Sequence, residues 1–520
     1  MTLWHLHPEN QWPDTLSDES RLRGEAVAIA FPETEEEAVS ALREAWERGW
    51  SITVQGGRTG IAGGAVPQGG AILNLSRMTR ILGLRRRESD GAFVVRVQPG
   101  VTLSALRQAL ATRDFATDGW SGADRQALEE FRKEPLWMVT ADPTETSATV
   151  GGMVACNASG ARSFRYGAIR RWVESVHVAL ADGAVLALAR GRERARGRTF
   201  RLEIGGGRIL EGVLPSYRMP TIKNAAGYYA ADDMDLLDLF IGSEGTLGVI
   251  LEAELVLKPA PPVEWGVTTF LPDTATVVRF VREVRAEPDG IVAIEYFSAS
   301  ALDLLRVART EGGSFATLPP VPKAHGGAVY VEIAAATEEQ AEPILERVVE
   351  IMKTCGGEEE KAWLATEPRE MERSKTFRHA VPERINALIA ERKKREPTII
   401  KLGTDMAVPD ERLEEVLALY ERGLMEGGFE AVLFGHIGNN HVHVNILPRD
   451  RAEVEAARRL YRAWAGQVGA WGGTISAEHG VGKLKKAFLP LMLGEEGVRQ
   501  MRAVKAVFDS GNRLGPGTLF

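Results

Sequence analysis

Apolar and polar positions in the first half of the chain predict short strands separated by helices. Residues 27–31 (VAIAF) and 51–54 (SITV) are apolar enough for strands, and Thr34 with Glu37 forms a capping-box pattern that begins a helix between them. Further strands are predicted at 71–75 and 92–98, a helix from about Leu103, and a hairpin at 176–186. Because helices do not alternate regularly with strands, this half predicts an α+β arrangement.

A proline-rich segment at 258–262 (KPAPP) predicts a domain boundary. Beyond it, strands are predicted at 266–271, 291–296, 328–333, 398–402, 431–434 and 441–447, and helices at 275–286, 299–309, 338–353 and 411–425. The excess of strands favours an antiparallel sheet with helices on one face. We therefore expect one domain over residues 1–260, a second over 261–450, and a mostly helical segment over 451–520.

The last of these strands has polar and apolar residues in strict alternation. In FGHIGNNHVHVN (434–445), a strand would place His441, His443 and Asn445 on one face and the valines between them on the other. His436 lies close upstream. Imidazoles at this spacing are plausible ligands of a divalent metal ion. Histidines satisfied within a strand are the alternative.

A second short segment, SAEHGVG (476–482), adds an acid and a further imidazole. Glu478 would complete a metal site, and the adjacent His479 would remain as a proton acceptor near neutral pH. An exposed Glu-His dipeptide is the alternative. The two segments together hold four of the nine histidines, which favours a functional site.

Three glycine-rich segments occur in the first half of the chain. Residues 56–70 include seven glycines, and 142–167 and 242–250 are similarly small and hydroxylated. Such loops let backbone N–H groups converge on an anion such as a pyrophosphate. The first loop lacks the Rossmann spacing and the closing Gly-Lys-Ser/Thr of a P-loop. Each could be an ordinary turn, but three of them favour a long cofactor.

Composition narrows the class of protein. A formal charge of −8 over 520 residues gives no reason to expect nucleic-acid binding. Only Cys156 and Cys355 occur, which argues against disulfides, a thiolate zinc site or an iron–sulfur cluster. The N-terminus lacks signal-peptide features, and no apolar run is long enough for a transmembrane helix. We expect a cytoplasmic protein, with peripheral membrane contact left open.

Five motifs resemble a known family. In order, GGRTGIAGGAVP, DPTETSATVGGMVACNASG, GSEGTLGVI, GHIGNNHVHVN and ISAEHGVG are similar to segments of the FAD-dependent 2-hydroxyacid dehydrogenases. That family includes D-lactate dehydrogenase, the glycolate oxidase flavin subunit and D-2-hydroxyglutarate dehydrogenase. The resemblance implies an FAD-binding domain of the p-cresol methylhydroxylase and vanillyl-alcohol oxidase type, a substrate domain, and C-terminal helices that pack back on the flavin side.

The resemblance also implies which residues hold FAD. Covalent members carry a flavin-linking histidine where this chain has Arg58 and Thr59, so non-covalent FAD is expected. The residues assigned in this way are Gly56, Gly57, Arg58, Thr59, Gly60 and Gly63 in the first loop, Pro143, Thr144, Thr149, Gly152, Asn157 and Gly160 in the second, and Glu244, Gly245 and Ile250 in the third.

For catalysis, the resemblance assigns metal ligands to His436, His443 and Glu478, the base to His479, and substrate binding to three residues. The latter are Arg378, Lys401 and Asn445. Zinc and manganese both suit such a site. The sequence departs from the family pattern at His441, where asparagine is common, and over 190–229, which is longer and more basic than expected.

Three functions remain open on the sequence. The first is oxidation of a D-2-hydroxy acid, with hydride passing to flavin N5 and electrons leaving to a quinone, a cytochrome, an electron-transfer flavoprotein or oxygen. The second is a non-redox reaction like that of alkyl-dihydroxyacetonephosphate synthase, suggested by HGVGK at 479–483 but disfavoured by Ala477-Glu478. The third is a non-catalytic flavoprotein subunit.

Overall fold

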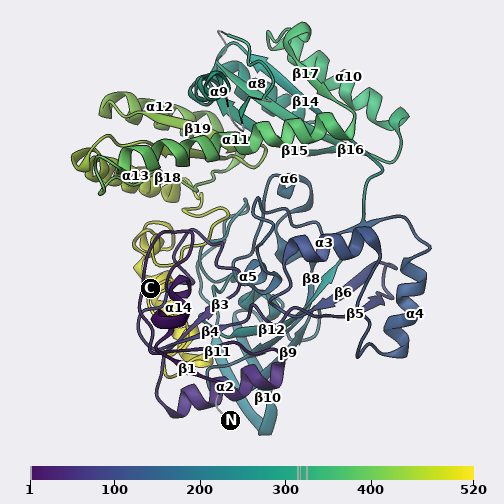
Figure 1. Ribbon diagram of the computed structural model, residues 1–520, viewed down its shortest axis with the longest axis vertical. Helices are drawn as coiled ribbons and strands as arrows, with labels where there is room; N and C mark the ends of the chain where they lie inside the picture. Colours follow the sequence, from purple (N-terminus) through teal and green to yellow (C-terminus); the bar gives the residue numbers. More distant parts are fainter. Residues whose placement is uncertain (1–2, 288, 313–314, 317, 324–325) are drawn as a thin grey trace.

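A computed structural model describes residues 3–520 except 288, 313–314, 317 and 324–325. It has two lobes (Figure 1). The lower lobe holds the chain up to β13 (Lys258–Pro259) together with α14 (Leu489–Phe508) and the C-terminal tail. The upper lobe is built on one large sheet and also holds α13 (Arg451–Ala470). The chain ends lie in the lower lobe, so the C-terminal segment returns to it after crossing the upper lobe.

The lower lobe contains two principal sheets. The first has the order β1-β2-β4-β3, in which the last three strands are parallel and fully or nearly buried. The second is antiparallel, in the order β5-β6-β12-β8-β9. Their bounds are His5–Leu6 (β1), Ala28–Ala30 (β2), Ile52–Gln55 (β3), Ala71–Asn74 (β4), Ile81–Arg86 (β5), Phe93–Val97 (β6), Val173–Ala179 (β8), Val185–Ala189 (β9) and Val249–Val256 (β12).

Helices and a separate hairpin surround these sheets. Thr34 caps α2 by accepting a hydrogen bond from the Glu37 amide, as the capping-box pattern predicts. The other elements include α1 (Pro8–Gln11), α2 (Glu35–Glu47), α3 (Leu103–Thr112), α4 (Gly122–Phe131), β7 (Trp137–Met138), α5 (Val150–Ala155), α6 (Ser163–Tyr166), α7 (Leu237–Phe240) and the hairpin of β10 (Thr199–Ile204) and β11 (Arg208–Val213).

The upper lobe is a seven-stranded antiparallel sheet in the order β17-β14-β16-β15-β19-β20-β18. Its strands are β14 (Val263–Leu271), β15 (Ile291–Ser298), β16 (Gly327–Ala335), β17 (Trp363–Ala365), β18 (Leu402–Gly403), β19 (Ala431–His436) and β20 (His441–Ile446). Its helices are α8 (Thr274–Arg285), α9 (Ala299–Glu311), α10 (Glu338–Thr354), α11 (Pro368–Lys393) and α12 (Leu413–Gly427).

The predicted α+β class is confirmed, but helices cover both faces of this sheet, whereas the sequence placed them on one. Val329, Val331 and Ile333 of β16 pack in the core shared with α8, α10 and α12. Ala328 and Tyr330 point to the other face and pack with α9 and α11. Alternate residues of a buried strand therefore serve two cores, which a nearly continuous apolar run does not reveal.

The C-terminal segment consists of α13 (Arg451–Ala470), α14 (Leu489–Phe508) and a tail. Leu514 forms a parallel bridge with Ile52 of β3, and the Leu519 amide donates to the Gly482 carbonyl. Phe508 at the end of α14 stacks on Phe200 of the β10–β11 hairpin. No helix among the described residues combines the length and apolar character needed to cross a membrane.

Candidate active site at the lobe boundary

The histidines of the alternating segment lie on the β19–β20 hairpin. His436 ends β19 and pairs with His441 at the start of β20, and His443 pairs with Phe434. The strand alternation buries Val444 completely and turns His441 and His443 to the other face. A tight turn between the two strands thus brings three imidazoles together, with ring centroids 4.3–5.8 Å apart.

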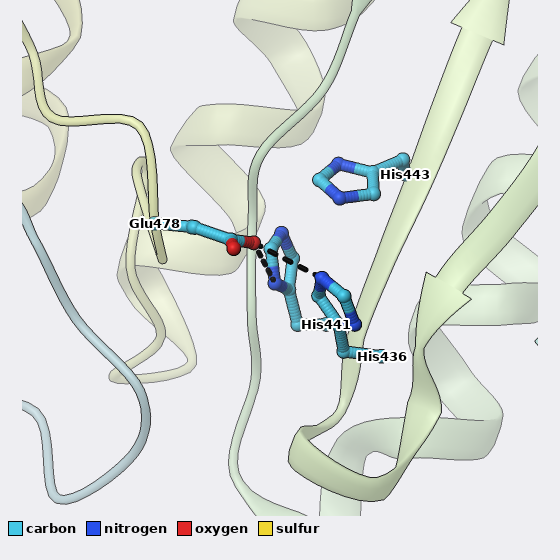
Figure 2. Close-up of side chains that lie close together, drawn as sticks. All are labelled: His436, His441, His443 and Glu478. Carbon is cyan, nitrogen blue, oxygen red and sulfur yellow. Dashed lines mark ion pairs between the residues drawn. The ribbon is translucent and has the colours of Figure 1, made fainter. Parts of the chain in front are cut away.

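Glu478 approaches these imidazoles from a C-terminal loop (Figure 2). Its Oε2 atom lies 3.1 Å from His436 Nε2 and 3.7 Å from His441 Nδ1. One ligand atom from each of His436, His441, His443 and Glu478 falls within 4.8 Å of all the others. Three imidazoles and a carboxylate are donors that zinc and manganese accept, so the set fits a divalent metal ion. His441 is the member that the resemblance did not assign.

Outer partners orient two of these rings. His436 Nδ1 lies 2.7 Å from Glu295 Oε1, and His443 Nδ1 donates to the Thr404 carbonyl at 2.9 Å. In each case Nε2 is left for a ligand, an arrangement common in histidine metal sites. Burial opposes the charge on His436, but Glu295 and Glu478 outweigh it and raise its pKa to about 9. Burial lowers the pKa of His441 to about 4.

Asp405 follows β18, is fully buried against the C-terminal loop, and was not identified from the sequence. It accepts hydrogen bonds from the His479 amide at 3.0 Å, from Ser476 Oγ at 2.6 Å and from Lys485 Nζ at 2.7 Å. Its Oδ2 atom also lies 3.3 Å from His479 Nδ1. Burial opposes ionisation of Asp405, but His479 and Lys485 hold its pKa well below the ordinary value.

The contact with Asp405 determines what His479 can do. A proton on Nδ1 faces the carboxylate, which leaves Nε2 as the acceptor. The ring lies nearly parallel to that of His443, with centroids 5.4 Å apart, and about a quarter of its side chain is exposed. Burial lowers the pKa of His479, although the Asp405 carboxylate opposes this shift. His479 is therefore a candidate base next to the cluster of His436, His441, His443 and Glu478.

The three residues assigned to substrate binding lie in different surroundings. Arg378, on α11, is 3.9 Å from Glu295 Oε2 and so reaches the outer partner of His436. Lys401 donates to Asn386 Oδ1 at 2.9 Å, about two turns along α11 from Arg378. Asn445 is buried on β20, opposite Gly403. The structure therefore brings Arg378 to the metal-ligand cluster, whereas Lys401 contacts a more distant part of the helix.

The glycine loops of the lower lobe pack closely on one another. A Cβ atom at Gly56 would lie 2.2 Å from Thr149 Oγ1, and one at Gly160 would lie 1.6 Å from the Asp142 carbonyl. A Cβ at Gly60 would meet nothing within 4 Å. The buried hydroxyls of Thr140, Thr149 and Ser159 have no hydrogen-bond partner among the described residues. Open space beside a glycine loop and unsatisfied hydroxyls fit a polar cofactor such as FAD.

Several residues expected to line FAD make contacts within the protein. Arg58 has a φ of 57° and donates to the Asp14 carbonyl. The Asn157 side chain donates to the Asn224 carbonyl and accepts from the Arg170 amide. Glu244 accepts hydrogen bonds from the Val481 and Gly482 amides. These side chains therefore hold the loops in place through contacts within the protein.

The other residues expected to bind FAD differ in how far they are exposed. Thr59 is half-buried, and Thr144 and Gly152 are exposed. Gly63 and Gly245 have φ values of 79° and 70°, which favour glycine. Ile250 is buried in β12, and Pro143 is half-buried beside the Asp142 carbonyl. A cavity of about 550 Å³ opens between Asn157, Met219, Lys223, Tyr229 and Asn439, and thus connects the second loop with the metal-ligand hairpin.

Comparisons with known proteins agree with this geometry. Residues 26–119 and 120–189 match the FAD binding domain, and residues 261–519 match the C-terminal domain of FAD linked oxidases. The chain belongs to the FAD-linked oxidase family. Both parts of this oxidoreductase architecture are therefore present, and the metal-ligand hairpin and the Glu478 loop both fall within the C-terminal domain.

Three curated members of the family match nearly all of the chain. D-lactate dehydrogenase of Anaerostipes hadrus is 29% identical over 97% of this chain and 92% of its own length. D-2-hydroxyglutarate dehydrogenase of Xanthomonas citri pv. viticola is 27% identical, covering 95% and 89%. Glycolate oxidase subunit GlcD of Bacillus subtilis is 25% identical, covering 95% and 88%.

Among solved structures, an alkyldihydroxyacetonephosphate synthase superposes with a TM-score of 0.61 over 95% of this chain and 77% of the other. The identity is 15%, so this similarity concerns the fold. The expected flavoprotein family and FAD-binding fold are confirmed.

Proposed function

We propose that this FAD-linked oxidoreductase oxidises a D-2-hydroxy acid to the corresponding 2-oxo acid. The observation that carries the proposal is the position of the Asp405–His479 pair directly beside the cluster of His436, His441, His443 and Glu478. A base next to a potential metal site suits removal of a hydroxyl proton. The names of the relatives, D-lactate and D-2-hydroxyglutarate dehydrogenase, support the substrate class.

His479 would take the hydroxyl proton on Nε2, because Asp405 holds Nδ1 and stabilises the imidazolium that results. Arg378 would bind the substrate carboxylate, since a guanidinium presents a planar pair of donors. Lys401 and Asn445 would contact the substrate from the β18–β20 side of the site. With the proton on His479 and a hydride removed from C2, the product is the 2-oxo acid.

The loops at 56–63 and 142–160 would hold FAD, which would supply N5 as the hydride acceptor. His436, His443 and Glu478, with His441 as a further donor, would hold a zinc or manganese ion. That ion would supply Lewis-acid chemistry at the hydroxyl oxygen. The open space at Gly60 and the unsatisfied hydroxyls of Thr149 and Ser159 support bound FAD, and Arg58-Thr59 in place of a linking histidine supports a non-covalent complex. Electrons would leave to a quinone, a cytochrome, an electron-transfer flavoprotein or oxygen.

Anaerobic titration of the purified flavoprotein with the D and L forms of lactate and 2-hydroxyglutarate tests the proposal. We expect the flavin absorbance to bleach with a D acid and the bleaching to be lost after chelation and restored by zinc or manganese. His479→Ala should retain FAD and reduce it at least a hundredfold more slowly, whereas the exposed control His5→Ala should behave as the wild type. A flavoprotein that no hydroxy acid bleaches would contradict the proposal.

A further inference from the structure

A line of buried charges runs from the second glycine loop into the upper-lobe sheet. Arg162, next to Gly160 in that loop, places Nε 2.6 Å from Glu332 Oε1 on β16. The other carboxylate oxygen of Glu332 lies 3.6 Å from Arg378 Nη1. Glu332 is 3% exposed, so its charge depends almost entirely on these two arginines. It therefore links the proposed carboxylate-binding arginine to a loop that faces the cofactor.

The line continues through the metal ligands and returns to its starting loop. Arg378 Nη2 is 3.9 Å from Glu295 Oε2, whose other oxygen holds His436, and His436 contacts Glu478. Lys223 Nζ then lies 3.3 Å from Glu478 Oε2 and donates to the Gly160 carbonyl at 3.2 Å. Bases and acids alternate over the seven side chains from Arg162 to Lys223. The neutral Gly160 carbonyl, which Lys223 contacts and which lies two residues before Arg162, closes them into a ring across the lobe boundary.

Within this ring, the orientation of Arg378 is set from one side by Glu332. Tyr330 reinforces the arrangement, because its hydroxyl donates to Glu332 Oε2 at 3.2 Å and its ring lies 5.3 Å from the Arg378 guanidinium carbon. The Arg378 Nε atom is buried and makes no hydrogen bond among the described residues. The guanidinium thus faces an acid at each end of its fork, at ion-pair distance, while its buried Nε–H has no acceptor among the described residues.

We propose that Glu332 is a positioning residue that fixes the Arg378 guanidinium for the substrate carboxylate, and that Arg162 fixes Glu332 relative to the flavin loop. This inference rests on the proposed function, because it requires Arg378 to bind the carboxylate. Glu332 itself touches neither substrate nor cofactor in this scheme. A misplaced guanidinium weakens substrate binding and leaves proton removal by His479 intact.

Glu332→Gln tests the inference, because glutamine preserves the volume and removes the charge. We expect KM for the hydroxy acid to rise at least tenfold, while kcat at saturating substrate changes less than threefold and the FAD content is unchanged. The matched control is Glu264→Gln. Glu264 contacts the same Arg162 guanidinium at 2.9 Å but has no contact with Arg378 among the described residues, so its KM should stay within twofold of the wild type.

Tyr330→Phe provides a milder second variant if Glu332→Gln does not fold. It keeps the aromatic ring against Arg378 and removes the hydroxyl that orients Glu332, so KM should rise two- to fivefold with kcat unchanged. If a hydroxy acid reduces the wild-type flavin but KM is unchanged in the Glu332 or Tyr330 variant, this inference alone would be overturned. A wild type that no hydroxy acid reduces would overturn the proposed function. Equal losses in kcat and thermal stability for Glu332→Gln and Glu264→Gln would assign the ring a purely structural role.

Discussion

At the scale of single residues, Asp405 organises the catalytic loop more than any motif residue does. Its carboxylate accepts a hydrogen bond from the His479 amide and faces the His479 ring. It also contacts the buried Lys485 ammonium and the His441 imidazole. Replacing an acid that holds a catalytic imidazole leaves the geometry largely intact but allows the wrong tautomer. In the proposed reaction, Asp405 should therefore act through His479.

We expect Asp405→Asn to lower the rate of flavin reduction by about two to four orders of magnitude, where the upper figure is the loss seen when the acid of a Ser-His-Asp triad is neutralised. FAD and metal contents should remain close to those of the wild type. Anaerobic stopped-flow measurement at saturating hydroxy acid checks this. Ser476→Ala removes a neighbouring hydrogen bond to the same carboxylate without removing its charge, and should cost less than tenfold. A variant that reduces its flavin at the wild-type rate would remove Asp405 from the catalytic group.

At the scale of elements, glycine has two different functions in the glycine-rich loops. Gly56 and Gly160 are required because a Cβ atom would collide with Thr149 and with the Asp142 carbonyl. Gly60 is different, since the space beside it is open within the protein. If that space belongs to the FAD pyrophosphate, an added methyl group should disturb the cofactor and leave the fold unchanged.

We expect Gly60→Ala to fold normally and to bind FAD at least tenfold more weakly, because the methyl group occupies the space into which a phosphate would come. Gly122→Ala is the matched control. A Cβ at Gly122 also meets nothing within 4 Å, and the residue lies in the first turn of α4, far from the glycine loops. Equilibrium titration of the apoproteins with FAD, followed by flavin fluorescence, measures both affinities. Equal affinities would place the pyrophosphate away from Gly60.

Sequence patterns predicted most elements but missed α11, the 26-residue helix that carries Arg378. Its core face follows helical spacing through Phe377, Val381, Ile385 and Ile389, but Pro382 and a dense set of charges obscured that stripe. Glu295 and Glu332 are each the single acid in an otherwise apolar strand, and this pattern indicates a buried carboxylate with a partner. Their partners could not be predicted, because they meet only through the strand order of the sheet.

At the scale of the whole molecule, the lobes are joined where the C-terminal loop crosses back to the lower lobe. Glu244, in the third glycine loop, accepts hydrogen bonds from the Val481 amide at 2.8 Å and the Gly482 amide at 2.7 Å. These amides follow Glu478 and His479 directly. The lower lobe therefore holds the loop that carries Glu478 and His479, the proposed metal ligand and base, while the histidine hairpin belongs to the upper lobe.

Glu244→Ala should release that loop without unfolding either lobe. Two hydrogen bonds to a carboxylate contribute about 1.5–3 kcal/mol each, so we expect faster hydrogen exchange at residues 478–482 and flavin reduction slowed at least tenfold. Glu252→Ala is the control, because Glu252 lies on β12 of the same lobe and faces Arg96 rather than the loop. Faster hydrogen exchange confined to residues 478–482 would show that the lower lobe positions His479, the proposed base. Unchanged exchange at residues 478–482 would mean that Asp405, which follows β18 of the upper lobe, holds the loop without Glu244.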